Sequence, residues 1–162
     1  MAYLLDANTF IQAKNEYYGF DICPGYWDWL ERGNAAGNIF SIDRIADELK
    51  QGNDPLAEWA SARGKKFFLP LDNPAVQAMR QVSSWVQSAD YQDHAKRAFL
   101  SSADPFLVAY GLAHGHTVVT REVHVEGERR KVKIPLVCRA LQVPCLRTFE
   151  MLRREGAKFV MG

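Results

Sequence analysis

The sequence predicts an α/β protein with one domain, in which helices cover both faces of a mostly parallel central sheet. Two short apolar runs, over residues 3–5 and 117–120, lead abruptly into polar residues. Continuous apolar runs of this length are typical of strands that are buried on both faces of a sheet. Strand-like and helix-like stretches alternate along the whole chain, which favours parallel strands joined by right-handed crossovers. Residues 1–162 are expected to form a single domain with its own core.

Strands and helices are expected to alternate in the first half of the chain. After the first strand, the expected elements are a helix over residues 10–15, a helix from Pro24 to Gly33, a strand over 39–40, a helix over 42–50 capped by Ser41, a helix over 55–63 and a strand over 66–69. The helix over 42–50 carries an apolar stripe at helical spacing, so that face is expected to pack on the core. The stripe consists of Ile42, Ile45, Ala46 and Leu49.

An aromatic-rich segment over residues 17–29 includes Tyr26, Trp27 and Trp29. One interpretation is a small core under a loop, because large aromatic side chains are mostly buried. The other is a surface that binds a partner, because Tyr and Trp are enriched at interfaces. The sequence favours the first interpretation and leaves the second open.

The second half continues the alternation. The expected elements are a helix over 74–86 with Val76, Met79 and Val82 inward, an exposed polar helix over 90–100, a helix between Ser102 and Gly115, strands over 117–120 and 143–146, a helix from Ile134, and a last helix over 148–154 capped by Thr148. The helix between Ser102 and Gly115 repeats apolar residues at core spacing and carries Asp104 in its first turn. Its expected core positions are Phe106, Ala109, Tyr110 and Ala113.

Composition excludes several classes of protein. The net charge of +1 gives no overall basic field, so any nucleic-acid binding must come from a local patch. Three widely spaced cysteines predict neither a disulfide framework nor a zinc site, and favour thiols in a reducing cytosol. We see no signal peptide and no apolar stretch long enough to span a bilayer, so a cytoplasmic protein without a membrane partner is expected.

Four acidic residues stand where this fold can bring separate segments together. Asp6 follows the first strand, and Glu122 lies just beyond the strand over 117–120. Glu48 flanks the apolar stripe of its helix, and Asp104 lies in the first turn of another helix. Ligands of open α/β sheets bind in the crevice outside the carboxyl ends of the strands. Each acid also has an ordinary alternative as a helix cap, a solvated surface charge or a partner of a helix dipole.

Carboxylates that lie close together repel one another unless a cation lies between them. Hard divalent cations prefer oxygen ligands, and Mg²⁺ takes only a few carboxylates while keeping several waters. Such a site suits phosphodiester hydrolysis, because the metal lowers the pKa of a water and stabilises charge on the phosphate. A site for Mg²⁺ or Mn²⁺ is therefore expected.

Four short segments stand out, in this order along the chain: Leu5-Asp6-Ala7-Asn8-Thr9-Phe10, Ala46-Asp47-Glu48-Leu49, Ser102-Ala103-Asp104-Pro105-Phe106 and Val118-Val119-Thr120-Arg121-Glu122. Together they resemble the successive motifs of the PIN-domain nucleases. The resemblance covers nearly the whole chain. Its first and third motifs are the most specific, whereas an acidic residue on a helix, as in the second, is common.

The resemblance implies a PIN-like parallel-sheet fold and Mg²⁺- or Mn²⁺-dependent cleavage of RNA. It also implies the role of toxin in a bacterial toxin–antitoxin pair, with a cognate protein antitoxin as partner. Carried over by position, Asp6, Glu48 and Asp104 are the catalytic, metal-binding acids. Glu122 takes the fourth acidic position, where many members have Asp, and its longer side chain reaches the metal directly or through a water.

Two polar residues complete the motifs. The resemblance implies that Thr120 places a hydroxyl near the metal and that Asn8 supports the metal-binding residues. Arg121, next to them, is expected to contact the scissile phosphate. The densest basic run consists of Arg129, Arg130, Lys131 and Lys133. It is either a solvated loop or a track for RNA phosphates, which supply most of the affinity for nucleic acid.

Two other functions remain open. A haloacid-dehalogenase-like phosphoryl-transfer enzyme begins with Asp-x-Asp after the first strand, but this chain has Asn8 at the second position. A catalytically inactive PIN-like module that only binds RNA or a protein partner is the alternative from a different class. The sequence does not fix the oligomeric state, and a homodimer is compatible with it.

Overall fold

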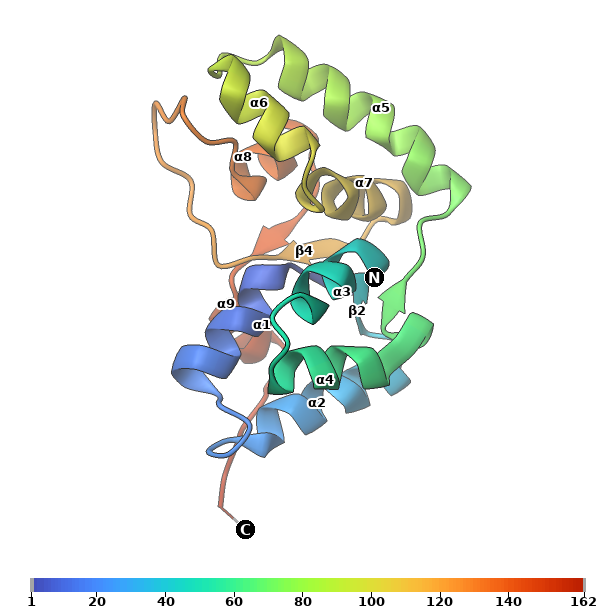
Figure 1. Cartoon of the computed structure of the whole chain (residues 1–162), viewed down its shortest axis with the longest axis vertical. Coiled ribbons are helices and arrows are strands. Elements are labelled where there is room, and N and C mark those ends of the chain that lie inside the picture. Colours follow the sequence, from blue (N-terminus) through green and yellow to red (C-terminus); the bar gives the residue numbers. More distant parts are fainter. Residues whose placement is uncertain (1, 162) are drawn as a thin grey trace.

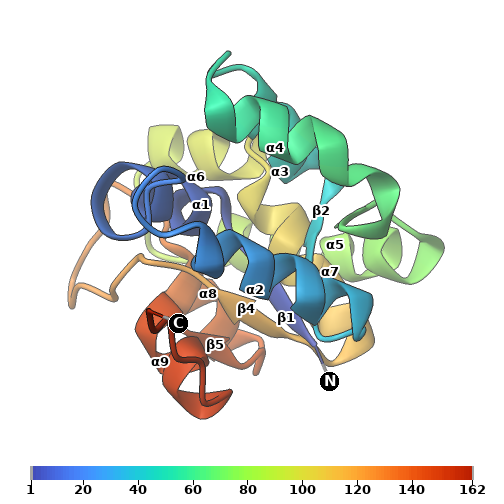
Figure 2. The same ribbon diagram turned by 90° about the horizontal axis from the view of Figure 1, so that it is seen from below.

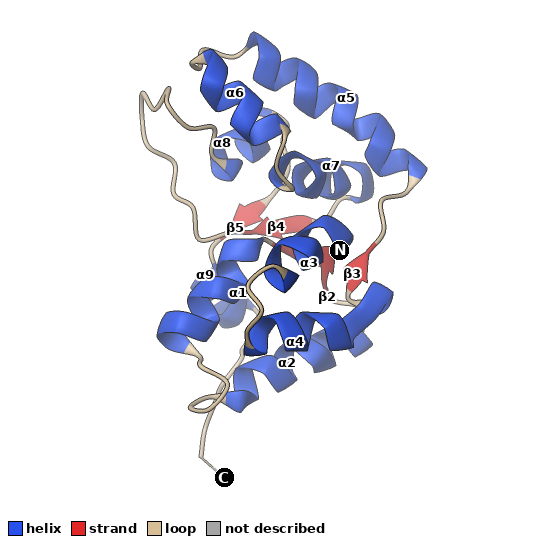
Figure 3. Cartoon of the chain, in the orientation of Figure 1, coloured by secondary structure: helices blue, strands red, loops and turns tan. Residues whose placement is uncertain are grey.

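A computed structural model describes residues 2–161 and has an α/β architecture around a five-stranded, all-parallel sheet (Figures 1 and 3). This confirms the predicted fold class, and the architecture is consistent with a PIN-like fold. The strands lie in the order β3-β2-β1-β4-β5. Their bounds are β1 Tyr3–Leu5, β2 Ile39–Ile42, β3 Phe68–Leu69, β4 Thr117–Val119 and β5 Cys145–Leu146.

Helices form a layer on each side of the sheet (Figure 3). The helices are α1 Ala7–Gln12 with the π-helix η1 Ala13–Tyr17, α2 Pro24–Ala35, α3 Asp43–Lys50, α4 Pro55–Arg63 with the 3-10 turn η2 Gly64–Lys66, α5 Asn73–Ser88, α6 Asp93–Leu100, α7 Asp104–His114, α8 Ile134–Ala140 and α9 Thr148–Arg154. Helices α5 to α8 lie above the sheet in Figure 1, whereas α1, α2, α4 and α9 lie below it. Seen from below, α2 crosses in front of β1 (Figure 2).

The strand order places a switch point between β1 and β4. From β1 the chain moves outward through β2 to β3, and it then returns to pair β4 with the other side of β1. The segment after β1 turns to one face as α1, and the segment after β4 reaches α8 on the other face (Figure 1). The two connections therefore diverge and leave a crevice at the carboxyl ends of β1 and β4, where ligands bind in such sheets.

Pairing between these two strands sets which residues meet at the crevice. Leu5 pairs with Val119, and the backbone N–H of Asp6 donates to the Val119 carbonyl at 2.9 Å. Asp6 and Thr120, the next residues along each strand, consequently lie side by side at the sheet edge.

The core lies on both faces of the central strands. Leu4 and Leu5 of β1 are completely buried, as expected for a strand covered on both sides. Tyr26 and Trp27 are also buried, so this part of the aromatic segment is core, whereas Tyr17 remains 49% exposed. Within residues 2–161, no helix has both the length and the apolar character needed to cross a bilayer.

Several expected details are wrong. Ser41 does not cap α3; it lies in β2 and donates its hydroxyl to the Leu5 carbonyl at 2.6 Å. Thr148 is the first residue of α9 rather than its cap, and its hydroxyl has no hydrogen-bond partner among the described residues. Helix α2 continues past Gly33 to Ala35. At these three helix ends, packing on the sheet outweighs the local preference of Ser or Thr for a cap position and of Gly for a helix end.

Helix α5 presents a different face from the expected one. Val76 is 54% exposed and Met79 is half-buried. The buried face, rotated from the expected one, consists of Ala75, Ala78, Val82 and Val86. The small side chains of Ala75 and Ala78 let α5 pack closely against α7, and this contact decides the orientation of the helix.

Two neighbouring helices also differ from expectation. Helix α6 buries Ala95 and Phe99, so it is not simply exposed. In α7, Phe106 and Ala113 are only partly buried, whereas Leu107 and Val108 are fully buried. Helix α7 lies between the sheet and other helices, so it buries more than one face.

Candidate active site

Asp6 lies between β1 and α1 and is almost completely buried, with 2% of its surface exposed. Its Oδ1 accepts a hydrogen bond from the Ala7 N–H at 2.7 Å, so it caps α1, as the simpler interpretation predicts. Its Oδ2 accepts the Thr120 hydroxyl at 2.9 Å. Burial raises the pKa of this carboxyl well above its usual range, and nearby Asp104 raises it further. A cap alone does not need a second carboxylate beside it.

A polar network joins the ends of β1 and β4. The Thr120 hydroxyl donates to Asp6 and accepts from the Glu122 N–H at 3.2 Å. The Asn8 side-chain amide donates to the same hydroxyl at 3.3 Å, and its oxygen accepts the Arg121 N–H at 3.0 Å. Asn8 and Thr120 therefore hold the two connections together and fix the orientation of Asp6.

Asp104 approaches from the first residue of α7. Its N–H donates to the Ser102 hydroxyl at 3.3 Å, and α7 is preceded by Ala103 rather than by a side-chain cap. Burial raises the pKa of the Asp104 carboxyl to about 7, with Glu122 and Glu48 adding to the shift. Within residues 2–161, no hydrogen bond reaches the Asp104 carboxylate. It is a half-buried acid that accepts none of the hydrogen bonds by which Asp6 is held.

Glu48 lies beside Asp104. Its Oε1 accepts the Ala103 N–H at 3.4 Å, immediately before α7 begins. Its residue surface is exposed, but burial of the carboxylate end still raises its pKa. Since Glu48 also raises the pKa of Asp104, the structure brings the second and third acidic motifs together.

Glu122 closes the cluster from the connection after β4. Its Oε1 accepts the Ile134 N–H at 3.3 Å, and its Oε2 lies 3.5 Å from the Lys131 ammonium. Only 9% of the Glu122 side chain is exposed. Unlike Asp104, it therefore has both a hydrogen bond and a cationic partner.

The donor atoms of this cluster fit a hard divalent cation. All of them are carboxylate oxygens. Burial and the nearby Glu122 and Glu48 raise the pKa of Asp104, and a cation would relieve the repulsion among these acids. In the described residues, no three His, Cys, Asp or Glu side chains already converge as a complete metal site. Mg²⁺ is usually held by one or two carboxylates together with waters, so Asp6 and Asp104 are sufficient in number.

The predicted RNA-binding residues divide into two sets. Arg121 and Arg130 form no ion pair among residues 2–161, and Lys131 pairs with Glu122 of the cluster. Arg129 pairs with Asp90 at 2.7 Å, and Lys133 lies 3.8 Å from Glu128. The basic run is therefore partly neutralised within the protein, and Arg130, which has no ion pair among the described residues, lines a hollow together with Asp104.

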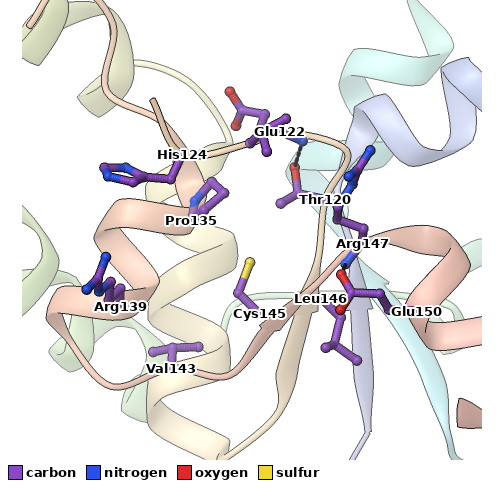
Figure 4. Close-up of a pocket in the computed structure, with 11 residues that line it drawn as sticks. Thr120, Glu122, His124, Pro135, Arg139, Val143, Cys145, Leu146, Arg147 and Glu150 are labelled. Atoms are coloured by element: carbon purple, nitrogen blue, oxygen red, sulfur yellow. Dashed lines mark hydrogen bonds between the residues drawn. The ribbon is translucent and has the colours of Figure 1, made fainter. Parts of the chain in front are cut away.

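Two hollows flank the acidic cluster. One has a volume of about 210 Å³ and is lined by Asp104, Arg130 and Lys131 among others. The other has a volume of about 380 Å³ and begins at Thr120 and Glu122 (Figure 4). We call the second one the β5 pocket, because it extends from the acids along β5. The acids thus lie between two recesses open to the surface.

Sequence reasoning missed two residues of the β5 pocket, Arg139 on α8 and Arg147 at the end of β5. Both are exposed and neither forms an ion pair within the described part of the chain. Neither belongs to a charge run or a motif, so the sequence offered no local signal; only the path of α8 past β5 brings them to one cavity.

Comparison with known proteins gives one family and one similar structure to report. No curated protein matches the chain. Among solved structures, the chain resembles one described as VapBC2 from Rickettsia felis bound to a DNA fragment from their promoter. The TM-score is 0.52 and the sequences are 13% identical, over 90% of this chain and 97% of that chain. A likeness at this identity shows that the fold is shared.

A family model described as domain of unknown function, DUF4411, matches residues 3–159. This range contains β1, all of the acids of the cluster and α9. Because the match spans nearly the entire sequence, the protein belongs to the DUF4411 family.

Proposed function

We propose that this protein is a PIN-like, metal-dependent endoribonuclease and the toxin of a toxin–antitoxin pair. The observation that carries the proposal is the Asp104 carboxylate. It is half-buried, it has no hydrogen-bond donor among residues 2–161, and desolvation together with the neighbouring Glu122 and Glu48 raises its pKa to about 7. A group in that state costs stability, and strongly perturbed acids in a crevice are typical of functional sites.

The acids have different tasks in this proposal. Asp6 and Asp104 hold a Mg²⁺ or Mn²⁺ ion, because desolvation and their proximity raise the pKa of both carboxyls, a cost that a cation would relieve. Glu48 and Glu122 border the same space and would act through waters, since Glu48 is an exposed residue and Glu122 already has the Ile134 N–H and the Lys131 ammonium as partners. Thr120 keeps Oδ2 of Asp6 in place.

The metal, when bound, supplies an activated water and stabilises charge on the phosphate and the leaving oxygen. The protein supplies orientation. Arg121 stands beside the network at the end of β4, where its side chain can contact a phosphate of RNA. Arg130 and Lys131 line the hollow next to Asp104 and extend that contact, while Arg129 and Lys133 lie farther along the same loop.

The nuclease proposal is tested by cleavage of a labelled single-stranded RNA that contains every dinucleotide step. We expect cleavage with Mn²⁺ and none with chelator. Asp104→Asn should lower the rate at least about 100-fold, because losing a residue that merely supports a metal ligand already costs up to that factor. Asp47→Asn, an exposed acid on α3, is the matched control and should cleave like the parent. Equal rates for parent and Asp104→Asn would leave a binding module as the better description.

The toxin part of the proposal rests on the motif resemblance together with the shared fold of the VapBC2 structure. An antitoxin must cover or enter the acidic crevice, and an Arg side chain suits that task because it pairs bidentately with carboxylates. Expression of the parent without a partner should slow bacterial growth, whereas Asp6→Asn at the same protein level should not. Identical growth of both strains would remove the toxin role while leaving the nuclease proposal in place.

A further inference from the structure

The β5 pocket has features that the acidic cluster does not use. Its volume is about 380 Å³, within the usual range for sites that bind small molecules. It lies between the connection after β4, helix α8, strand β5 and the start of α9 (Figure 4). Its apolar lining comes from Val123, Pro135, Val143 and Leu146. At one end it reaches Thr120 and Glu122, so a ligand in the pocket lies next to the acids.

The charges of the pocket are arranged at its two sides. Arg139 projects from α8 on one side, and Arg147 reaches from β5 toward Thr120 on the other (Figure 4). Neither guanidinium has an ionic partner within residues 2–161, although five other Lys and Arg residues are paired with acids. The Glu150 carboxylate accepts the Arg147 N–H at 3.1 Å, and Glu150 also lines the pocket.

This combination selects a particular ligand chemistry. An apolar surface of this size suits a flat aromatic ring, and free guanidinium groups suit phosphate oxygens or the acceptor edge of a base. A nucleotide carries both an aromatic ring and a phosphate. RNA-binding proteins recognise single-stranded bases that are splayed out of the chain and held in this manner.

We propose that the β5 pocket is a nucleotide subsite, which binds one base of a single-stranded RNA beside the scissile phosphate. The inference rests on the proposed nuclease function for its biological meaning. The base lies over Val143 and Leu146, and its phosphate contacts Arg147 at the end near Thr120. Arg139 contacts the outer edge of the base. The pocket then determines where in the RNA the chain is cleaved.

Cys145 provides a reporter inside the pocket. Its sulfur points into the cavity in Figure 4, and the residue is half-buried. Cys23 is half-buried as well but lies before α2, beyond the pocket, and so serves as a control in the same sample. Cys138 is buried. Alkylation of Cys145 by iodoacetamide, followed by mass spectrometry of the peptides, therefore measures occupancy of the pocket without any need for cleavage.

The experiment compares alkylation rates with each of the four ribonucleoside 5′-monophosphates, in the presence of chelator. At least one nucleotide should slow modification of Cys145 in a saturable manner and leave Cys23 unaffected. Arg147→Gln or Arg139→Gln should raise the concentration for half-protection about tenfold, the loss expected for one charge-assisted hydrogen bond. Arg32→Gln, an exposed arginine on α2, should change nothing.

Ribose 5-phosphate separates a nucleotide site from a simple anion site. If it protects Cys145 as well as the nucleotides do, the pocket does not bind a base and the inference is wrong. Absence of protection by all four nucleotides, or unchanged protection in both arginine variants, also overturns it. A protein that cleaves RNA but shows no protection keeps the nuclease function and loses the subsite. A protein that shows base-dependent protection but never cleaves RNA keeps the subsite and loses the nuclease function.

Discussion

At the residue scale, the site depends on a buried acid that accepts hydrogen bonds and a half-buried acid that accepts none within the described residues. Asp6 accepts hydrogen bonds from Ala7 and Thr120, whereas Asp104 accepts none from residues 2–161. The pKa of Asp104 rises to about 7 because burial and neighbouring acids both disfavour its charge. Local signals predicted both positions, since each acid follows a strand or begins a helix. They did not predict Arg139 and Arg147, which meet only through tertiary packing.

The raised pKa of Asp104 makes the stability of the metal-free protein depend on pH. Its folded pKa lies above its value in the unfolded chain, so the stabilisation is complete below the unfolded pKa and is lost as pH rises toward about 7. Each pH unit between the two values costs up to about 1.4 kcal/mol, or roughly 3–5 °C in Tm. Thermal scans in chelator between about pH 5 and pH 8 should show this decline.

Asp104→Asn should make that pH dependence shallower and should melt above the parent at neutral pH in chelator. Asp47→Asn is the control and should follow the parent at every pH. A variant Asp104→Asn that melts below the parent in chelator would show that Asp104 is a structural residue.

Thr120 allows a test of how Asp6 is held. Thr120→Val keeps the shape of the side chain and removes its hydroxyl. That hydroxyl donates a hydrogen bond to Asp6 and accepts one from the Glu122 N–H. Changes of this kind cost about 10–100-fold in metal affinity. Titration calorimetry with Mn²⁺ should therefore show weaker binding for Thr120→Val and near-parental binding for Thr120→Ser. Equal affinity of parent and Thr120→Val would mean that Asp6 needs no such support.

At the scale of elements, α7 and β4 position the two halves of the site. Gly111 of α7 lies so close to the sheet that an added Cβ would be 3.2 Å from Val118 and from Val143, and 3.3 Å from the His116 carbonyl. A glycine inside a helix ordinarily weakens it, but the structure gives Gly111 a packing role. Strand and helix boundaries were predicted less well than their existence, because short strands end where neighbouring strands and helices dictate.

Gly111→Val should destabilise the protein by about 1–3 kcal/mol, the usual cost of overpacking. The variant has to push α7 away from β4, so its Mn²⁺ affinity should fall together with its Tm. Ala113→Val, at a partly buried position of the same helix, is the matched control and should change the Tm less. A Gly111→Val protein with parental Tm would contradict the close approach of α7 to the sheet.

At the scale of the whole molecule, the parallel sheet explains why distant motifs meet. Asp6 and Thr120 are 114 positions apart, yet β1 and β4 are neighbours in the sheet. The alternation of strands and helices was sufficient to predict this fold class. The order of the strands was not predictable from that alternation, and it is the order that creates the crevice.

Metal should stabilise the folded protein as a whole, because an intact site exists only in the folded state. At about one hundred times its dissociation constant, Mn²⁺ contributes about 2.7 kcal/mol. For a protein of this size, that corresponds to a rise of roughly 5–10 °C in Tm. Asp104→Asn should show a much smaller rise, and a full-sized response in this variant would place the metal elsewhere.

The central claim is that Asp6 and Asp104 together hold a divalent cation. A crystal soaked in Mn²⁺ and measured at a wavelength where manganese scatters anomalously tests it most directly. We predict an anomalous peak in the crevice, in direct coordination with oxygens of both Asp6 and Asp104, at about 2.1 Å as for Mg²⁺. At saturating Mn²⁺, a crevice without a peak, or a peak that contacts neither carboxylate, would contradict the claim.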